Sequence, residues 1–284
     1  MNGILGKSVV KSIALLVGMC ATVSPAWAHV TLQAPNGGEV LGVGCTVEIR
    51  WRIDIQHNQL NWDLWYSTTG SGGPWIAIAM DLPPGSFAVG SIHTYDWTVP
   101  DDASNQVRVR VRMDNSGTDY YDISNGDLSI VPPTRPDSFW LFRGILTGGG
   151  LNELLASDDS WMTVRPGITL GQTEPSVQLI VIGTAPTENP TELRFRVEAH
   201  ADINNIGQWI ELFNYITNSY DLVDFMIATT VDSIVEVTIT NDPWRYVQAG
   251  TKEMTAKVSY LEAGIILSYP WLVSIDQTVW IICD

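Results

Sequence analysis

The sequence predicts an all-β protein that consists of two β-sandwich domains. The first observation is a period-two alternation of apolar and polar residues in 46–55 (TVEIRWRIDI), 107–113 (VRVRVRM), 193–200 (LRFRVEAH) and 235–240 (VEVTIT). Successive side chains of a strand point to opposite faces, so each segment predicts a strand with one buried and one solvated face. Strands of this kind are typical of antiparallel sheets.

Turn-forming stretches at short intervals are the second observation. They lie at residues 36–38 (NGG), 69–74 (TGSGGP), 83–85 (PPG), 115–117 (NSG) and 217–219 (TNS). Many short strands separated in this way favour sandwiches over helical folds. After residue 28 we find no amphipathic helix pattern, although residues 149–156 have room for one or two helical turns.

A proline-rich stretch divides the chain. Residues 131–136 (VPPTRP) contain three prolines, which cannot continue a ladder of strand hydrogen bonds. We therefore expect a first domain at residues 29–131, a linker at 132–137 and a second domain at 138–284. Both domains have an ordinary size for one hydrophobic core.

The first 28 residues are typical of a cleaved signal peptide. Lys7 and Lys11 form a basic start, residues 13–21 form a short apolar core, and Ala26 and Ala28 fit the small-x-small cleavage pattern. A lipoprotein anchored through Cys20 is the alternative, but the preceding methionine fits that cleavage poorly. We expect a secreted protein, extracellular or at the cell surface, that is not inserted in a membrane.

The chain is strongly acidic, with a formal net charge of −16, and its first 28 residues contain no acidic residue. Such a surface repels phosphate backbones, so nucleic acid is an unsuitable partner. We expect an extracellular protein or a polysaccharide instead.

Two cysteines, Cys45 and Cys283, remain after cleavage. In an oxidising compartment they could form a disulfide that ties the two ends of the protein together. Because our domain boundaries place them in different domains, we favour two separate buried thiols.

The N-terminal half resembles a known domain family. The signatures are APNGGEVLGVGCTVEIRW, WDLWYSTTGSGGPWIAIA, HTYDWTVPDDASNQVRVRVRMDN and DISNGDLSI, in that order. They resemble the immunoglobulin-like domain of fungal Ser/Thr-rich, GPI-anchored cell-wall proteins linked to β-glucan assembly, which also occurs in secreted bacterial proteins. The resemblance implies a non-catalytic sandwich. Asn36, Gly37 and Gly38 suit a tight turn with positive φ, and Trp65, Trp75 and Trp97 suit burial between sheets.

The C-terminal half is similar to a C-terminal domain that recurs in large secreted bacterial proteins and has no established role. The matching stretches are SFWLFRGILTGGGLNELLASDDSWMTVRPG, ELRFRVEAHAD, IELFNYITNSYDLVDF and WLVSIDQTVWI. Its strands and the IDQTVWI ending also resemble jelly-roll carbohydrate-binding modules, an analogy at the level of fold. The full expectation is an immunoglobulin-like sandwich followed by a jelly-roll-like sandwich.

His29 would be the first residue of the mature chain. An amino-terminal histidine forms half of the copper-binding brace of oxidative polysaccharide-cleaving enzymes, which needs a second histidine. The sequence gives no reason to place His57, His93 or His200 near the N-terminus. We therefore favour a residue that merely precedes a strand, and a protein that is not an enzyme.

Two acidic stretches are candidates for metal binding or catalysis. Residues 114–127 (DNSGTDYYDISNGD) offer carboxylates that suit calcium, although their spacing is not that of an EF-hand. The candidate ligands are Asp114, Asp119, Asp122 and Asp127, and a simple hairpin turn is the alternative. We predict no other cofactor. Asp158, Asp159 and Asp276 are candidate catalytic carboxylates. Asp158 and Asp159 cannot act together as a glycosidase pair, because neighbours in a strand face opposite sides, and we favour a turn there.

Aromatic residues of the second domain are the feature that best indicates a function. They are Trp209, Tyr215, Tyr220, Trp244, Tyr246, Tyr269 and Trp271. Exposed rings form platforms for sugars, although most aromatic residues of a sandwich lie in its core. Tyr215 and Tyr220 flank a hairpin tip with Asn218, so we expect these three to be the exposed ligand-binding residues.

We therefore predict a non-catalytic secreted protein that acts as an extracellular adhesion, cell-surface or matrix component. The alternative is a carbohydrate-binding module that uses the aromatic residues of the C-terminal domain.

Overall fold

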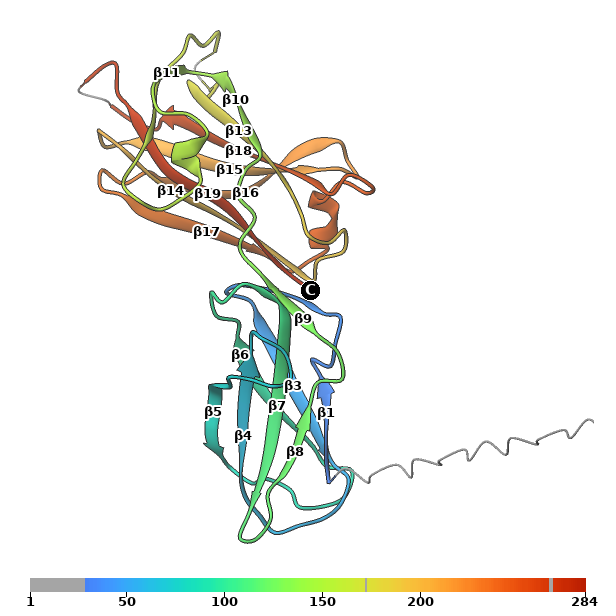
Figure 1. The fold of residues 1–284 in the computed structure, drawn as a ribbon. Helices are drawn as coiled ribbons and strands as arrows, with labels where there is room; N and C mark the ends of the chain where they lie inside the picture. The colour runs from blue at the N-terminus through green and yellow to red at the C-terminus, as the bar shows by residue number, and fades with distance from the viewer. Residues whose placement is uncertain (1–28, 172, 266–267) are drawn as a thin grey trace, which may run out of the picture.

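The computed structural model describes residues 29–171, 173–265 and 268–284 as two β-sandwiches stacked end to end (Figure 1). The predicted all-β fold is confirmed, since sheets make up both domains. The predicted signal peptide, with Cys20, lies outside the described residues. None of the helices in the described part of the chain has the length and apolar character needed to span a bilayer.

The first domain consists of two packed sheets. Its strands are β1 (Val30–Ala34), β2 (Val40–Gly42), β3 (Thr46–Ile53), β4 (Gln59–Ser67), β5 (Ile76–Leu82), β6 (Ile92–Thr98), β7 (Ser104–Asn115), β8 (Tyr120–Ile123) and β9 (Leu128–Val131). One sheet has the order β1-β3-β6, and the other has the order β2-β9-β7-β4-β5, with β8 beside β7. All pairs are antiparallel except β2 with β9.

The alternation seen in the sequence builds the core of this domain. Ile49, Trp51 and Ile53 of β3 are buried against the inward residues of β7, while the polar residues between them face solvent. Of the three predicted core tryptophans, only Trp97 is buried. Trp65 and Trp75 instead lie on the outer face, where both contact the guanidinium of Arg110 at 4.5 and 4.3 Å from the ring centroids. Cation–π stacking on an outward arginine is the physical reason for this difference.

The second domain is a sandwich of two further sheets. Its strands are β10 (Ser138–Arg143), β11 (Ile145–Gly148), β12 (Met162–Arg165), β13 (Val177–Thr184), β14 (Glu192–Ala201), β15 (Ile206–Asn214), β16 (Ser219–Ile227), β17 (Ser233–Ile239), β18 (Glu253–Glu262) and β19 (Val273–Cys283). Short 3₁₀ helices lie at η1 (Asn152–Leu154) and η2 (Pro243–Tyr246). The sheet orders are β10-β13-β18-β15-β16 and β11-β12-β19-β14-β17. Because the chain crosses repeatedly from one sheet to the other, the topology is jelly-roll-like.

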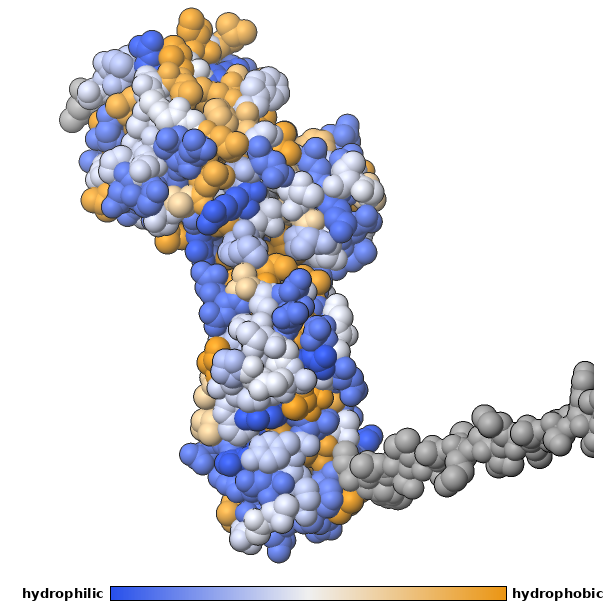
Figure 2. Space-filling view, viewed as in Figure 1, coloured by the Kyte–Doolittle hydropathy of each residue, from blue (hydrophilic) through white to orange (hydrophobic). Residues whose placement is uncertain are grey.

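A disulfide joins Cys45 of the first domain to Cys283 at the end of β19. Our expectation of two separate thiols was wrong. The last strand runs past its own sandwich to the waist of the molecule, where Figure 1 also marks the C-terminus. There Cys45 and Cys283 are buried together with Ile281, so residues from different domains share one small core. Figure 2 shows hydrophobic residues at the surface of the same waist.

Backbone contacts reinforce this junction. Thr134, within the predicted linker, exchanges two hydrogen bonds with Trp280 of β19, at 2.7 and 2.9 Å. The guanidinium of Arg194 donates to the carbonyl oxygen of Gly44 at 2.8 Å. Asp137, the last residue of the predicted linker, also donates its N–H to the carbonyl oxygen of Ile182 at 2.7 Å. The linker is therefore paired with the second domain at Thr134 and Asp137, which, unlike the prolines around them, keep their N–H groups.

Gly42 allows the closest approach between the domains. A Cβ atom placed on it would collide with the carbonyl oxygen of Ile282 and lie 2.8 Å from Sγ of Cys45. We expect Gly42→Ala to lower the free energy of unfolding by about 1–3 kcal/mol, as is usual for overpacked sites. Gly117→Ala is the matched control, since its Cβ would meet nothing within 4 Å. Thermal unfolding followed by circular dichroism measures both, and equal melting temperatures would contradict the tight junction.

Candidate functional site

The outer face of the sheet β10-β13-β18-β15-β16 carries the candidate site. In this sheet Leu179, Val258 and Ile210 point into the core. Side chains alternate along each strand, so the intervening residues all point to the opposite, outward face. That face is unusually rich in aromatic and long polar side chains.

Strand register aligns the outward residues in two rows that cross the sheet. The first row consists of Trp140, Ile180, Lys257, Glu211 and Leu222, which are direct partners from β10 to β16. In the second row Gln178, Ser259, Trp209 and Phe225 are likewise partners. On β10 the partner of Gln178 is Arg143, and Phe142, in the irregularity before it, lines the same hollow as Gln178. Two adjoining hollows follow these rows and share Gln178 and Lys257. We call the two rows and their hollows the sheet groove.

Aromatic residues occupy both ends of the sheet groove. Trp140 is 58% exposed and packs edge-to-face on Phe142 at 5.3 Å between ring centroids. At the other end Phe225 is 51% exposed and lies 4.8 Å from the ring of Trp209. Strands are about 4.8 Å apart, so five of them span about 19 Å. The groove therefore fits an extended ligand.

Polar groups occupy the middle of the sheet groove. The ammonium group of Lys257 lies 2.9 Å from Oε2 of Glu211. It also lies 4.3 Å from the ring centroid of Tyr220, which it partly covers. Gln178 is held in place by donation from Nε2 to the carbonyl oxygen of Pro175 at 3.2 Å. Apolar platforms with a few fixed polar groups between them are the usual composition of a small-molecule or sugar site.

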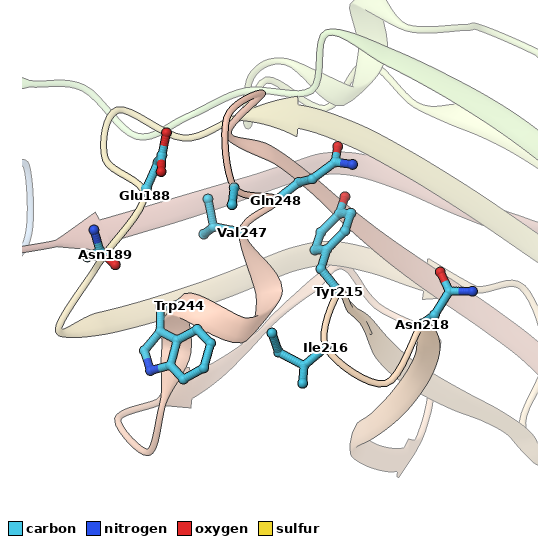
Figure 3. Close-up of a pocket in the computed structure, with 9 residues that line it drawn as sticks. Glu188, Asn189, Tyr215, Ile216, Asn218, Trp244, Val247 and Gln248 are labelled. Carbon is cyan, nitrogen blue, oxygen red and sulfur yellow. The ribbon is translucent and has the colours of Figure 1, made fainter.

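The structure separates the three predicted ligand-binding residues. Tyr220 lines the sheet groove, where burial, and then the charge of Glu211, raise the pKa of its hydroxyl to about 12. Tyr215 and Asn218 line a different hollow beside Trp244 and Ile216 (Figure 3). Both tyrosines are half-buried, although we expected them to be the most exposed.

The hollow in Figure 3, which we call the loop pocket, is less suited to a ligand. The hydroxyl of Tyr215 already donates to Glu253 at 3.1 Å, and burial raises the pKa of that hydroxyl. Asn218 has φ of 54°, which is the conformation of a tight turn. The ring of Trp244 is exposed and lies at the edge of the loop pocket (Figure 3).

Sequence reasoning missed Trp140 and Phe142, which contribute most of the exposed aromatic surface at one end of the groove. The signal was present in residues 138–143 (SFWLFR), where aromatic and aliphatic residues occupy both faces of a strand. Phe139 and Leu141 pack against the core, so Trp140 and Phe142 must face outward. An outward face of this kind is a stronger indicator of binding than position near a hairpin tip.

Two of the four aspartates proposed as calcium ligands share Arg112, and the other two contact different partners. Asp114 and Asp119 both lie 3.5 Å from the guanidinium of Arg112. Asp122 accepts the N–H of Leu32 at 2.7 Å, and Asp127 pairs with Arg108 at 2.6 Å. The structure does not gather these carboxylates around one point, and calcium binding by this loop stays a prediction.

A different set of carboxylates does converge. Oxygens of Asp159, Asp232 and Asp276 lie within 4.8 Å of one another, which makes them the one such group of three among the described residues. Asp276 is only 1% exposed and accepts the N–H groups of Asp158 and Asp159 at 3.0 and 3.2 Å. Asp159 has φ of 62°, as in a turn. Asp276 therefore organises the turn that contains Asp158 and Asp159.

His29 has a neighbour that the sequence did not indicate. Nδ1 of His29 lies 2.6 Å from Nε2 of His57, and the ring of Tyr120 stacks on that of His29. We had found no reason to place a second histidine near the N-terminus. Pairing of β1 with β3 brings the residues that follow β3 back beside His29, which is a contact between segments 28 residues apart.

Comparisons with known proteins give fold similarities only. No protein-family model and no curated protein matches the chain. Among solved structures it is similar to one described as "CBM4 structure and function" (TM-score 0.34, 11% identity, 52% of this chain and 88% of that one). It is also similar to the N-terminal cellulose-binding domain of Cellulomonas fimi β-1,4-glucanase C (TM-score 0.31, 17% identity, 51% and 88%). Similarity this weak says nothing about a ligand for this chain.

Asp276 makes stability depend on pH. Burial, and then the charges of Asp232 and Asp158, raise the pKa of its carboxyl group. A raised pKa in the folded state means that stability is greatest below the ordinary carboxyl pKa and is lost as pH rises through the folded value. In a chelating buffer we expect Asp276→Asn to raise the melting temperature at neutral pH and to flatten its decline between pH 4 and 7.

The exposed carboxylate Asp137 provides the control, as Asp137→Asn. The amide oxygen that Asp276→Asn introduces can still accept the N–H groups of the turn, so folding is preserved. A lower melting temperature for Asp276→Asn at neutral pH in chelator would contradict this assignment.

Proposed function

We propose that the C-terminal domain binds polysaccharide in the sheet groove. The observation that carries the proposal is the arrangement of aromatic rings at both ends of an approximately 19 Å row, with an ion pair and an amide between them. Sugar rings present apolar faces that stack on aromatic side chains, and their hydroxyl groups bond to polar ones. The groove supplies both on one rigid sheet.

The form of the groove favours a chain over a single sugar. A monosaccharide would occupy only one end, whereas Trp140 and Phe225 lie on the two edge strands of the sheet. The surface between them is carried by strands on which side chains are fixed by packing. We propose that several consecutive sugar units of a polysaccharide lie across the strands.

We propose a role in attachment rather than catalysis, in a protein that acts outside the cell. The acidic cluster that could have suggested glycoside hydrolysis does not have the form of a catalytic pair. Asp276 is buried and bonded to the backbone of Asp158 and Asp159 on the sheet opposite the groove. A protein of this kind would hold a cell surface or matrix to a polysaccharide through its second domain.

Depletion from solution by a panel of insoluble polysaccharides tests this function. We expect one polymer to remove the protein, and Trp140→Ala or Trp209→Ala to weaken that binding by about 5- to 150-fold, since each removes about 1–3 kcal/mol of stacking. Trp244→Ala is the matched control, because it removes an exposed tryptophan from the loop pocket instead. Circular dichroism of each variant checks that the sandwich is intact.

The outcome also separates the two hollows. Loss of binding in Trp244→Ala, with full binding in Trp140→Ala, would transfer the site to the loop pocket. No depletion by any polymer would refute polysaccharide binding and leave a protein partner as the ligand.

A further inference from the structure

Two histidines and a tyrosine converge beside the start of β1. This strand begins at the end of the first domain that lies away from the second domain (Figure 1). His29 directly precedes β1, His57 lies between β3 and β4, and Tyr120 begins β8. Three segments far apart in the sequence thus meet at one point. Ring centroids of His29 and Tyr120 are 3.6 Å apart with planes inclined by 6°.

Backbone hydrogen bonds hold His29 against the segment that follows β3. The carbonyl oxygen of His29 accepts the N–H groups of Asp54 and Ile55 at 3.0 and 3.2 Å. The residue that carries one imidazole is therefore bonded to the segment that carries the other. The flat contact with Tyr120 then sets the plane of the His29 ring, while the ring of His57 lies 4.7 Å from the same tyrosine.

The two ring nitrogens point at each other. Nδ1 of His29 and Nε2 of His57 are separated by 2.6 Å, which is the distance of a hydrogen bond, so one of the two facing nitrogens carries a hydrogen and the other a lone pair. When both neutral rings carry their hydrogen on the opposite nitrogen, both facing nitrogens offer a lone pair that a metal ion can accept. Two imidazoles that converge from separate segments onto one point form a metal-binding arrangement.

Cleavage after Ala28, as the signal-peptide pattern predicts, would add a third ligand. The new α-amino group belongs to the same residue as Nδ1 of His29, so the two nitrogens can chelate a single ion. Nitrogen ligands suit Cu(II), which also stands highest in affinity among the divalent first-row metals.

We propose that the mature protein binds one Cu(II) ion through the α-amino nitrogen and Nδ1 of His29 and through Nε2 of His57. Metal–nitrogen bonds are about 2 Å long, so the two ring nitrogens move apart to at most about 4 Å. His57 lies outside the strands, in residues 54–58, where a movement of this size breaks no sheet pairing. The site is independent of the sheet groove and of any sugar ligand.

Metal titration of the chain 29–284 tests the proposal, after mass spectrometry has confirmed that His29 is its first residue. Calorimetry with Cu(II) should show one ion per chain, and electron paramagnetic resonance should show a single Cu(II) species with nitrogen hyperfine coupling. We expect His57→Ala to weaken binding by more than tenfold, because it removes a ligand atom. His93→Ala, which changes a histidine elsewhere in the same domain, should bind as tightly as the parent.

A chain with Gly-Ser inserted before His29 isolates the role of the amino group. This chain keeps both imidazoles and should fold normally, with a melting temperature in chelator equal to that of the parent. We expect it to lose more than tenfold in Cu(II) affinity and to change the resonance spectrum. Copper binding that is equal in the extended and mature chains would overturn the proposed ligand set.

Three other outcomes would also overturn the proposal. They are the absence of stoichiometric copper from the mature chain, tighter binding of Zn(II) than of Cu(II), and sequencing of the secreted protein that shows a first residue other than His29. A melting temperature measured in chelator identifies a substituted variant that fails to fold. In that case the chain with Gly-Ser before His29 still tests the proposal, because it contains no substitution.

Discussion

The two domains depend on the last strand, β19. It lies between β12 and β14 inside one sheet of the jelly-roll-like sandwich, and nearly all of its residues are buried. Its end continues to the waist, where Cys283 is joined to Cys45 and Ile282 lies against Gly42. The same strand therefore completes the core of the second domain and fastens it to the first. A covalent bond between residues 238 positions apart also restricts the unfolded chain, which is why such bonds stabilise a protein.

The two proposed sites differ in what holds their side chains: the strands of one sheet carry the sheet groove, and segments beside strands carry the histidine pair. The sheet groove arises because strict alternation sends one set of side chains into the core and leaves the other set aligned in rows by strand register. Lys257 and Glu211 pair in the centre of a face whose edges are aromatic. The histidine pair instead lies in segments that flank strands, because β1 begins where β3 ends.

The acidic composition of the chain brings several carboxylates close together at one place in the second domain. Asp232 and Asp276 lie close together, and burial, followed by mutual repulsion, raises the pKa of Asp276. In contrast, the carboxylates of residues 114–127 are each neutralised by an arginine or bonded to a backbone N–H group. The net charge indicates that cations are suitable guests, but only the tertiary contacts show which carboxylates have an arginine beside them.

The sequence by itself determined the all-β class and the buried faces of strands such as β3 and β7, because period-two alternation is a local property that survives in any antiparallel sheet. It also indicated that aromatic residues of the second domain are the best candidates for function. Only the tertiary structure decided that Tyr215 and Tyr220 belong to different hollows, that Trp140 completes the groove, that Cys45 meets Cys283 and that His57 lies beside His29. Each of these depends on strand order and register between distant segments, which alternation along a single strand does not encode.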